Sequence, residues 1–257
     1  MPEANKNKDN CLHSSSHDYS SFAREVQSLK KCEEVNFRKN ENIIIGGDQP
    51  THIYIIKTGY VRSFRINQHG QFTILGLHYP GEIIGSELII DDSSDYFASS
   101  IGKSTLFKVP VETFLQSKHS TKLLSLKLKS LQNLLSIFCK LSATEKICWF
   151  ILRHSINQNS KGYITNSFEL GFSRNDIANF IGITSETLSR IMNKLKLEHI
   201  IALDGKYISI LDFTKLLEKV PSEWKQYLSN IERGYQYCPI CDLESELADT
   251  SPLTLLG

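Results

Sequence analysis

The sequence predicts an α+β protein: an N-terminal antiparallel β-roll, then a long dimerisation helix, then a C-terminal winged helix-turn-helix. Three observations predict it: short β-rich runs broken at regularly spaced glycines, a helical leucine repeat, and two short helical segments followed by a hairpin signal. The predicted domains are a mobile leader (1–20), a β-roll sensor domain (21–110), the helix (111–142), a winged-helix domain (143–220) and a C-terminal extension (221–257).

The composition is that of an ordinary globular protein. Of the 257 residues, 40% are hydrophobic and 22% are charged, and the formal net charge is +1, which excludes a disordered or supercharged chain. No apolar run approaches the ~20 residues of a membrane span, and the first residues lack the apolar segment of a secretory signal. Six cysteines are too few for a disulfide framework at this length. We therefore expect a cytoplasmic protein with no membrane partner.

Short β-rich runs fill the stretch from Asn42 to Val109. Turn residues recur about every eleven or twelve positions, which is the rhythm of an antiparallel sandwich or roll. Strands that alternate with helices would need longer connections, so a parallel α/β sheet is not expected. The turns are predicted at Gly47, Gly59, Gly70 and Gly81.

A helical period replaces the β pattern after Val111. Apolar residues follow one another at alternating spacings of four and three, the register of a two-stranded coiled coil. The alternative is that this stripe packs on the roll, although a second apolar face is available for that contact at Leu123, Leu126 and Leu134. The predicted dimerisation residues are Leu124, Leu128, Leu131, Leu135 and Phe138.

The most informative segment, residues 173–192, reads SRNDIANFIGITSETLSRIM. It predicts two short helices joined at Gly182, which can adopt the positive φ of a tight turn, with the small Ala178 where the helices approach. Thr184 is a good N-cap for the second helix, and Glu186 lies in its first turn. The shared core is predicted at Ile177, Ile181, Ile183, Leu188 and Ile191.

The second helix keeps a polar face once its apolar stripe is set aside. Arginine, glutamate and serine are side chains that read base edges in the major groove, and lysines suit phosphate contacts. Downstream, Asp204-Gly205 between two β-rich runs predicts a hairpin, which would be the wing. The candidate residues for binding double-stranded DNA are Arg174, Thr184, Ser185, Glu186, Ser189, Arg190, Asn193 and Lys194.

A β-roll, a long helix and a winged helix in this order resemble the CRP/FNR superfamily of bacterial transcription regulators, from about Asn42 to Phe213. The most specific pieces are Thr58-Gly59, the run YPGEIIG at 79–85, and residues 173–190, where ETLSR is similar to the FNR-type recognition helix (E-x-x-S-R). The resemblance implies a homodimeric activator that binds a palindrome like TTGAT-N4-ATCAA. It also implies a contact with RNA polymerase at the hairpin loop 67–70.

The sequence departs from the ligand patterns of that superfamily at two places. Cyclic-nucleotide binders place an Arg-Ser pair where this chain has Ser94-Asp95, and Asp95 would repel a cyclic phosphate, although Glu87 could still contact a ribose. Oxygen-sensing members hold a [4Fe–4S] cluster with clustered N-terminal cysteines, whereas this leader has only Cys11 and the roll has Phe107 where a further cysteine would fall. Neither cyclic AMP nor that cluster is therefore expected.

The remaining cysteines leave alternatives open. Cys238 and Cys241 form a C-x-x-C pair that is half of a zinc or Fe–S site, a thiol–disulfide switch, or simply two reduced thiols. Cys139 and Cys148 are expected to be small buried hydrophobic residues. No catalytic residue is predicted, because no nucleophile–base grouping or phosphate loop is present. The alternative function is a redox- or metal-responsive module that acts through the C-terminal pair or through protein contacts.

Overall fold

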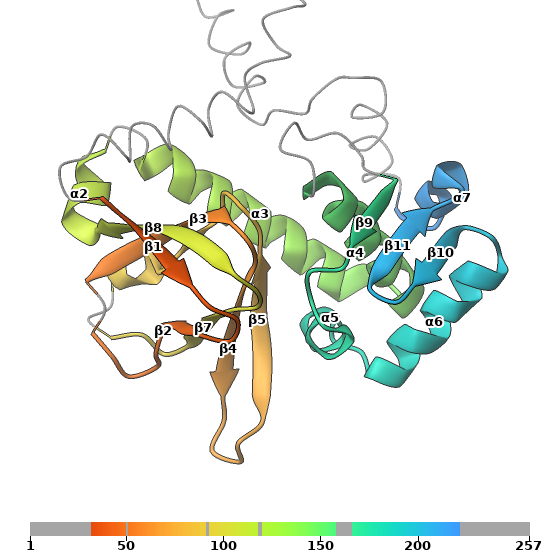
Figure 1. Cartoon of the computed structure of the whole chain (residues 1–257), viewed down its shortest axis with the longest axis horizontal. Coiled ribbons are helices and arrows are strands. Elements are labelled where there is room, and N and C mark those ends of the chain that lie inside the picture. Colours follow the sequence, from red (N-terminus) through yellow and green to blue (C-terminus); the bar gives the residue numbers. More distant parts are fainter. Residues whose placement is uncertain (1–31, 50, 91–92, 118–119, 158–165, 222–257) are drawn as a thin grey trace, which may run out of the picture.

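The computed structural model describes residues 32–49, 51–90, 93–117, 120–157 and 166–221. It confirms the predicted α+β class, with antiparallel sheets in the N-terminal half and a helix-turn-helix near the C-terminus (Figure 1). Among the described residues, no helix is both long and apolar enough to cross a membrane.

Two four-stranded antiparallel sheets form the roll, and a short 3₁₀ helix, η2 (Ser86–Ile89), follows β6. The first sheet has the order β1 (Glu33–Phe37), β8 (Ser104–Pro110), β3 (His52–Thr58), β6 (Ile83–Ile84). The second has the order β2 (Asn42–Ile44), β7 (Phe97–Ser100), β4 (Val61–Ile66), β5 (Phe72–His78). Strand β5 therefore lies at an edge of the second sheet.

All four glycines predicted at turns have a positive φ, which confirms the turn positions. Gly59 shows why no other residue would serve. Its φ is +85°, and a Cβ atom there would lie 2.3 Å from Ser104 Oγ. The turn between β3 and β4 therefore needs glycine both for its backbone conformation and for its space.

The helical stretch expected at 111–142 is divided. Helix α2 (Val111–Gln116) ends where Ser117 adopts an extended backbone, with φ −69° and ψ 135°. The long helix α3 (Ser120–Lys140) follows, and two residues separate it from α4 (Ala143–Asn157).

The C-terminal domain is a winged helix. Its elements are β9 (Ser167–Glu169), α5 (Arg174–Ile181), α6 (Ser185–Leu197), β10 (Ile201–Asp204), β11 (Tyr207–Ile210) and α7 (Phe213–Glu218). The hairpin was predicted one residue too early. Asp204 pairs with Tyr207, so the two loop residues are Gly205 and Lys206 rather than Asp204 and Gly205. Gly205 supplies the positive φ, +57°, at the start of the loop.

The largest buried cluster joins the two domains. Ile74, Leu77 and Tyr79 of the roll belong to it together with α4 and the core of the winged helix. His154 on α4 is fully buried within this cluster. The Tyr79 hydroxyl donates to His154 Nδ1 (3.1 Å), and Nε2–H donates to the Glu169 carbonyl (3.0 Å). The rings around His154 are those of Tyr60, Tyr79, Phe150, Phe168 and Phe172.

Helix α5 lies beside β5 of the roll (Figure 1), and polar side-chain contacts hold it there. The Arg62 guanidinium lies 2.9 Å from the carboxylate of Asp176, which is buried. The side-chain amide of Asn179 accepts the backbone N–H of Ile74 at 2.7 Å and donates to the Phe72 carbonyl at 3.2 Å. The first helix of the helix-turn-helix is thus held along β5.

Stability should fall in acid because His154 must stay neutral in the fold. Burial, with a smaller effect of Arg153, lowers the pKa of His154 to about 4, against the hydrogen bond to Glu169. The stability conferred by the neutral ring is complete above pH ~6.5 and is lost as the pH falls toward 4, by roughly 3 kcal/mol in total. Urea unfolding of wild type and His154→Gln across this range measures the effect.

His154→Gln should be less stable at neutral pH, since it loses ring packing, but its stability should change less steeply with pH. Parallel pH profiles for the two proteins would contradict this assignment.

Candidate nucleic-acid interface

Helices α5 and α6 and the turn between them have the predicted local geometry. Ser173 caps α5 by accepting the Asp176 N–H at 3.1 Å. Gly182 ends α5 with φ 72° and ψ 41°, and Thr184 caps α6 by accepting the Thr187 N–H at 3.1 Å. These caps satisfy backbone donors at both helix starts and so fix where α6 begins.

Apolar residues lock the two helices together. Of the five predicted core residues, four are buried and Ile183 is half-buried against the same cluster. Ala178 is also buried, as its position at the helix crossing requires. The buried residues on α6 are Leu188, Ile191, Met192 and Leu195.

The opposite face of α6 is polar and exposed, and the helix lies at the edge of the molecule, apart from the roll (Figure 1). All eight candidate DNA-binding residues belong to α6, its N-cap or the first turn of α5. Ser185 and Ser189 are partly exposed. The exposed members are Arg174, Thr184, Glu186, Arg190, Asn193 and Lys194.

Two neighbouring features were not predicted from the sequence. Asn175 on α5 accepts a hydrogen bond from the Ser185 hydroxyl on α6, with 2.7 Å between the oxygens. The wing places exposed Lys206 in its loop and exposed Tyr207 directly after it. The turn chemistry at Gly205 could have indicated the wing residues, but nothing in the sequence indicates the contact between Asn175 and Ser185.

Lys127 of α3 contacts the part of the roll formed by β6 and η2. Its ammonium donates to Ser86 Oγ at 2.6 Å and to the Ile83 carbonyl at 3.3 Å, and it lies 4.0 Å from a carboxylate oxygen of Glu87. Burial lowers the pKa of Lys127, while Glu87 opposes that shift. Nearby, the Tyr96 hydroxyl accepts the Gly85 N–H at 3.1 Å.

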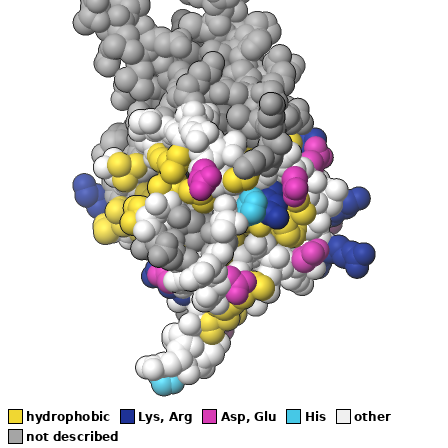
Figure 2. Space-filling model, turned by 90° about the vertical axis from the view of Figure 1, so that its left-hand side faces the viewer, with side chains coloured by type: hydrophobic (Ala, Val, Ile, Leu, Met, Phe, Trp, Pro, Cys, Tyr) yellow, Lys and Arg dark blue, Asp and Glu magenta, His cyan; other side chains and the backbone are white. Residues whose placement is uncertain are grey.

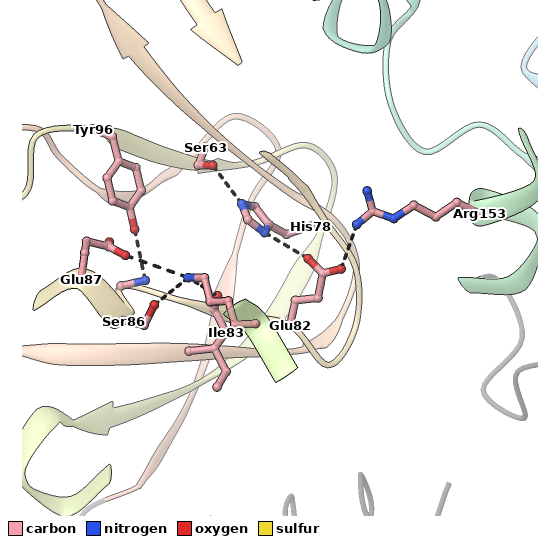
Figure 3. Close-up of polar contacts among 10 residues, drawn as sticks. Ser63, His78, Glu82, Ile83, Ser86, Glu87, Tyr96 and Arg153 are labelled. Carbon is pink, nitrogen blue, oxygen red and sulfur yellow. Dashed lines mark hydrogen bonds and ion pairs between the residues drawn. The ribbon is translucent and has the colours of Figure 1, made fainter. Parts of the chain in front are cut away.

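A second polar chain joins the roll to α4 (Figure 3). Ser63 Oγ lies 2.9 Å from His78 Nε2, His78 Nδ1 lies 3.1 Å from Glu82, and Glu82 lies 3.2 Å from the Arg153 guanidinium. Burial would raise the pKa of Glu82, but its contacts with His78 and Arg153 lower that pKa on balance. The charged carboxylate thus ties the domains together.

The five predicted dimerisation residues divide into two groups. Leu124 packs against the buried cluster of the first roll sheet, and Phe138 packs edge-on against Phe180 with 5.4 Å between ring centres. The other three are exposed on the middle of α3: Leu128 (58%), Leu131 (47%) and Leu135 (64%).

The cysteines in the described residues give one confirmation and one correction. Cys148 is fully buried as expected, and burial raises the pKa of its thiol to about 12. Cys139 was expected to be buried but is exposed. Phe138 packs on the winged helix, and the next residue, about 100° further round the helix, faces away.

No group of three possible metal ligands lies among the described residues. Those residues therefore do not fit a cluster or zinc site of their own. Cys11 and the pair Cys238 and Cys241 lie outside the described residues.

Comparison with known proteins gives matches for both domains. Residues 34–120 match the family model of the cyclic nucleotide-binding domain, and residues 145–219 match that of the Crp-like helix-turn-helix domain. The chain is 28% identical over 189 residues to the fumarate and nitrate reduction regulatory protein of Vibrio cholerae, covering 70% of this chain and 76% of that one. It is 29% identical over 189 residues to the anaerobic regulatory protein of Haemophilus influenzae, covering 70% and 74%.

Solved structures show the same fold. FixK2 from Bradyrhizobium japonicum aligns with a TM-score of 0.65 at 22% identity, over 74% of this chain and 98% of that one. TTHA1359 from Thermus thermophilus aligns with a TM-score of 0.60 at 21% identity, over 73% and 97%. Fold and relatives together define a helix-turn-helix transcription regulator that binds DNA, not an enzyme. The two domain matches and the relatives support the CRP/FNR superfamily as the family of this chain.

Replacing Gly182 should test the left-handed turn between α5 and α6. An added Cβ would meet nothing within 4 Å, so the cost of Gly182→Ala comes from the positive φ alone and should be ~1 kcal/mol. Gly182→Asn should cost less, because asparagine tolerates this conformation better. Urea unfolding measures both, and an alanine variant as stable as wild type would contradict the turn geometry.

Proposed function

We propose that the protein acts as a homodimer on a palindromic DNA site resembling TTGAT-N4-ATCAA. The observation that supports this most directly is the polar face of α6, with Glu186, Ser189 and Arg190 at the positions of the FNR-type motif. Arginine can pair with guanine O6 and N7, and glutamate can accept from cytosine N4. In this proposal these three side chains, together with Ser185 and Asn193, read bases.

Contacts with phosphates would hold the helix in register. Arg174 is the first residue of α5 and Lys194 lies in the last turn of α6, and both are exposed. The Thr184 hydroxyl lies at the N-terminus of α6. Such contacts add affinity without sequence information, and they weaken as salt rises.

The exposed leucines of α3 support the dimer. Leu128, Leu131 and Leu135 lie on one side of the helix at spacings of three and four, and burial in a symmetric seam would remove their apolar surface from water. A two-fold seam would also place two recognition helices for the two half-sites of a palindrome.

The hairpin between β4 and β5 is the proposed contact for RNA polymerase. Through this contact the protein would activate transcription in the cytoplasm. Figure 2 shows it as a projection below the body, with hydrophobic side chains above its tip. Ile66 and Phe72 are about half exposed where the strands end. The loop is ordered by Asn67, whose side-chain oxygen accepts the N–H groups of His69 and Gln71.

The contacts of Lys127 support a regulator that does not use cyclic AMP. Asp95 lies in the segment that a cyclic phosphate would approach, and it forms an ion pair with Arg65. Lys127 already contacts Ser86 and Glu87, the glutamate that could otherwise bind a ribose. In this proposal DNA binding needs no added nucleotide, and Cys238 and Cys241 have no part in reading bases.

Removing Arg190 should separate specific from nonspecific binding. Arg190→Ala should weaken binding to the palindrome by at least ~30-fold, because a bidentate contact to one base is lost in each of the two half-sites. Binding to an unrelated duplex should change by no more than ~2-fold. Fluorescence anisotropy with both duplexes measures this.

Arg38→Ala is the control, since it removes one exposed positive charge from the roll rather than from α6. If Arg190→Ala binds the palindrome as tightly as wild type, the proposed reading face is wrong.

A charge in the seam should separate the protomers. Leu131→Glu should give monomers and abolish binding to the palindrome, because two carboxylates would face each other in the buried seam. Leu115→Glu on α2 is the matched control, since Leu115 and Leu131 are equally exposed, 47% each. Light scattering measures the mass, and an unchanged dimer for Leu131→Glu would contradict the seam.

A further inference from the structure

The contact between Asn175 and Ser185 links the two helices at the start of the reading face. Asn175 is the second residue of α5, and Ser185 is the first residue of α6. The Ser185 hydroxyl donates to Asn175 Oδ1 across 2.7 Å. This bond joins two residues ten positions apart that both remain accessible from solvent.

Other acceptors near this point are already in use. The Asp176 carboxylate accepts from Ser173 Oγ at 2.7 Å and pairs with Arg62. Thr184 Oγ1 accepts the Thr187 N–H at 3.1 Å. Among the described neighbours, Asn175 is therefore the acceptor that takes the Ser185 proton.

This bond decides what Ser185 can offer to DNA. A serine hydroxyl has one proton and two lone pairs, so a free serine can either donate to a base or accept from one. Once its proton is committed to Asn175, Ser185 can only accept. The major groove presents donors at adenine N6 and cytosine N4, and acceptors at guanine O6 and N7 and at thymine O4.

We propose that Asn175 is a specificity-determining residue, which polarises Ser185 so that it selects adenine or cytosine over guanine or thymine at one position of each half-site. The inference rests on the proposed function, because it requires α6 to lie in the major groove. Asn175 acts through Ser185 and is therefore a positioning residue for the base reader.

The anchoring of α5 holds Asn175 in place to accept the Ser185 proton. Its helix is anchored to the roll by Asp176 and by Asn179, both of which lie on α5 with it. An exposed hydrogen bond has little net value in water, but a DNA interface excludes water and strengthens the bond. The orientation of the hydroxyl would then be fixed where the base is read.

The experiment measures binding to a set of symmetric duplexes. Starting from TTGAT-N4-ATCAA, each position of the half-site is changed in turn to all four base pairs. Ser185→Ala identifies the position that Ser185 reads, as the one whose base preference it removes. At that position wild type should favour adenine or cytosine by ~5- to 10-fold.

Two substitutions of Asn175 then distinguish an effect on the orientation of the Ser185 hydroxyl from a purely structural contact between α5 and α6. Asn175→Ala should reduce the preference to within ~2-fold, because the freed hydroxyl can donate or accept. Asn175→Asp should keep the preference, since a carboxylate also accepts the Ser185 proton, while it weakens binding to all four duplexes through repulsion from phosphates. Unchanged thermal midpoints for both variants would show that they remain folded.

A matched control exists in the roll. Thr105 Oγ1 donates to Asn36 Oδ1 at 2.8 Å, which is the same exposed hydroxyl–amide pair at a place remote in sequence from α5 and α6. Asn36→Ala should leave every duplex affinity unchanged.

Three results would overturn the inference. The first is an equal loss for all four bases in Asn175→Ala, which would make Asn175 a brace only. The second is a preference for guanine or thymine in wild type, and the third is no effect of Ser185→Ala at any position. If Arg190→Ala still loses specific binding, the proposed function stands while this inference fails.

Discussion

The buried aromatic cluster around His154 is the interaction on which the rest of the structure depends. It is formed by residues of the roll, of α4 and of the winged helix, so the two domains share one buried cluster. Because interiors are close-packed, a shift of one domain must disturb rings of the other. The polar face of α6 is therefore placed relative to the roll by packing, and the polar contacts of Arg62, Asn179 and Glu82 hold the two domains in one orientation.

Much of this could be predicted from the sequence, because local rules dominate there. Positive φ at turn glycines, the cap at Thr184 and the apolar stripe of α6 are short-range features, and the structure has them all. The loop of the wing was predicted one residue too early, at Asp204 and Gly205, because an Asp-Gly pair is typical of a two-residue hairpin turn. Cys139 was placed inside because its neighbour Phe138 is apolar, although adjacent helix residues face different ways.

Contacts between distant residues could not be predicted. The lysine of α3 that reaches Ser86, and the asparagine of α5 that holds Ser185, depend on how whole elements cross. In both cases a side chain of this protein takes up one hydrogen-bonding site of a serine. These contacts reduce the number of further hydrogen bonds that Ser86 in the roll and Ser185 in α6 can form.

The side-chain amide of Asn179 has a consequence for the roll itself. Strand β5 is the last strand of its sheet, and Asn179 satisfies one N–H and one C=O of that open edge. Unpaired edges are templates for pairing with other chains, and proteins often cover them. The winged helix thus shields the sheet against intermolecular strand addition. A roll separated from its winged helix would expose that edge and would be prone to aggregate.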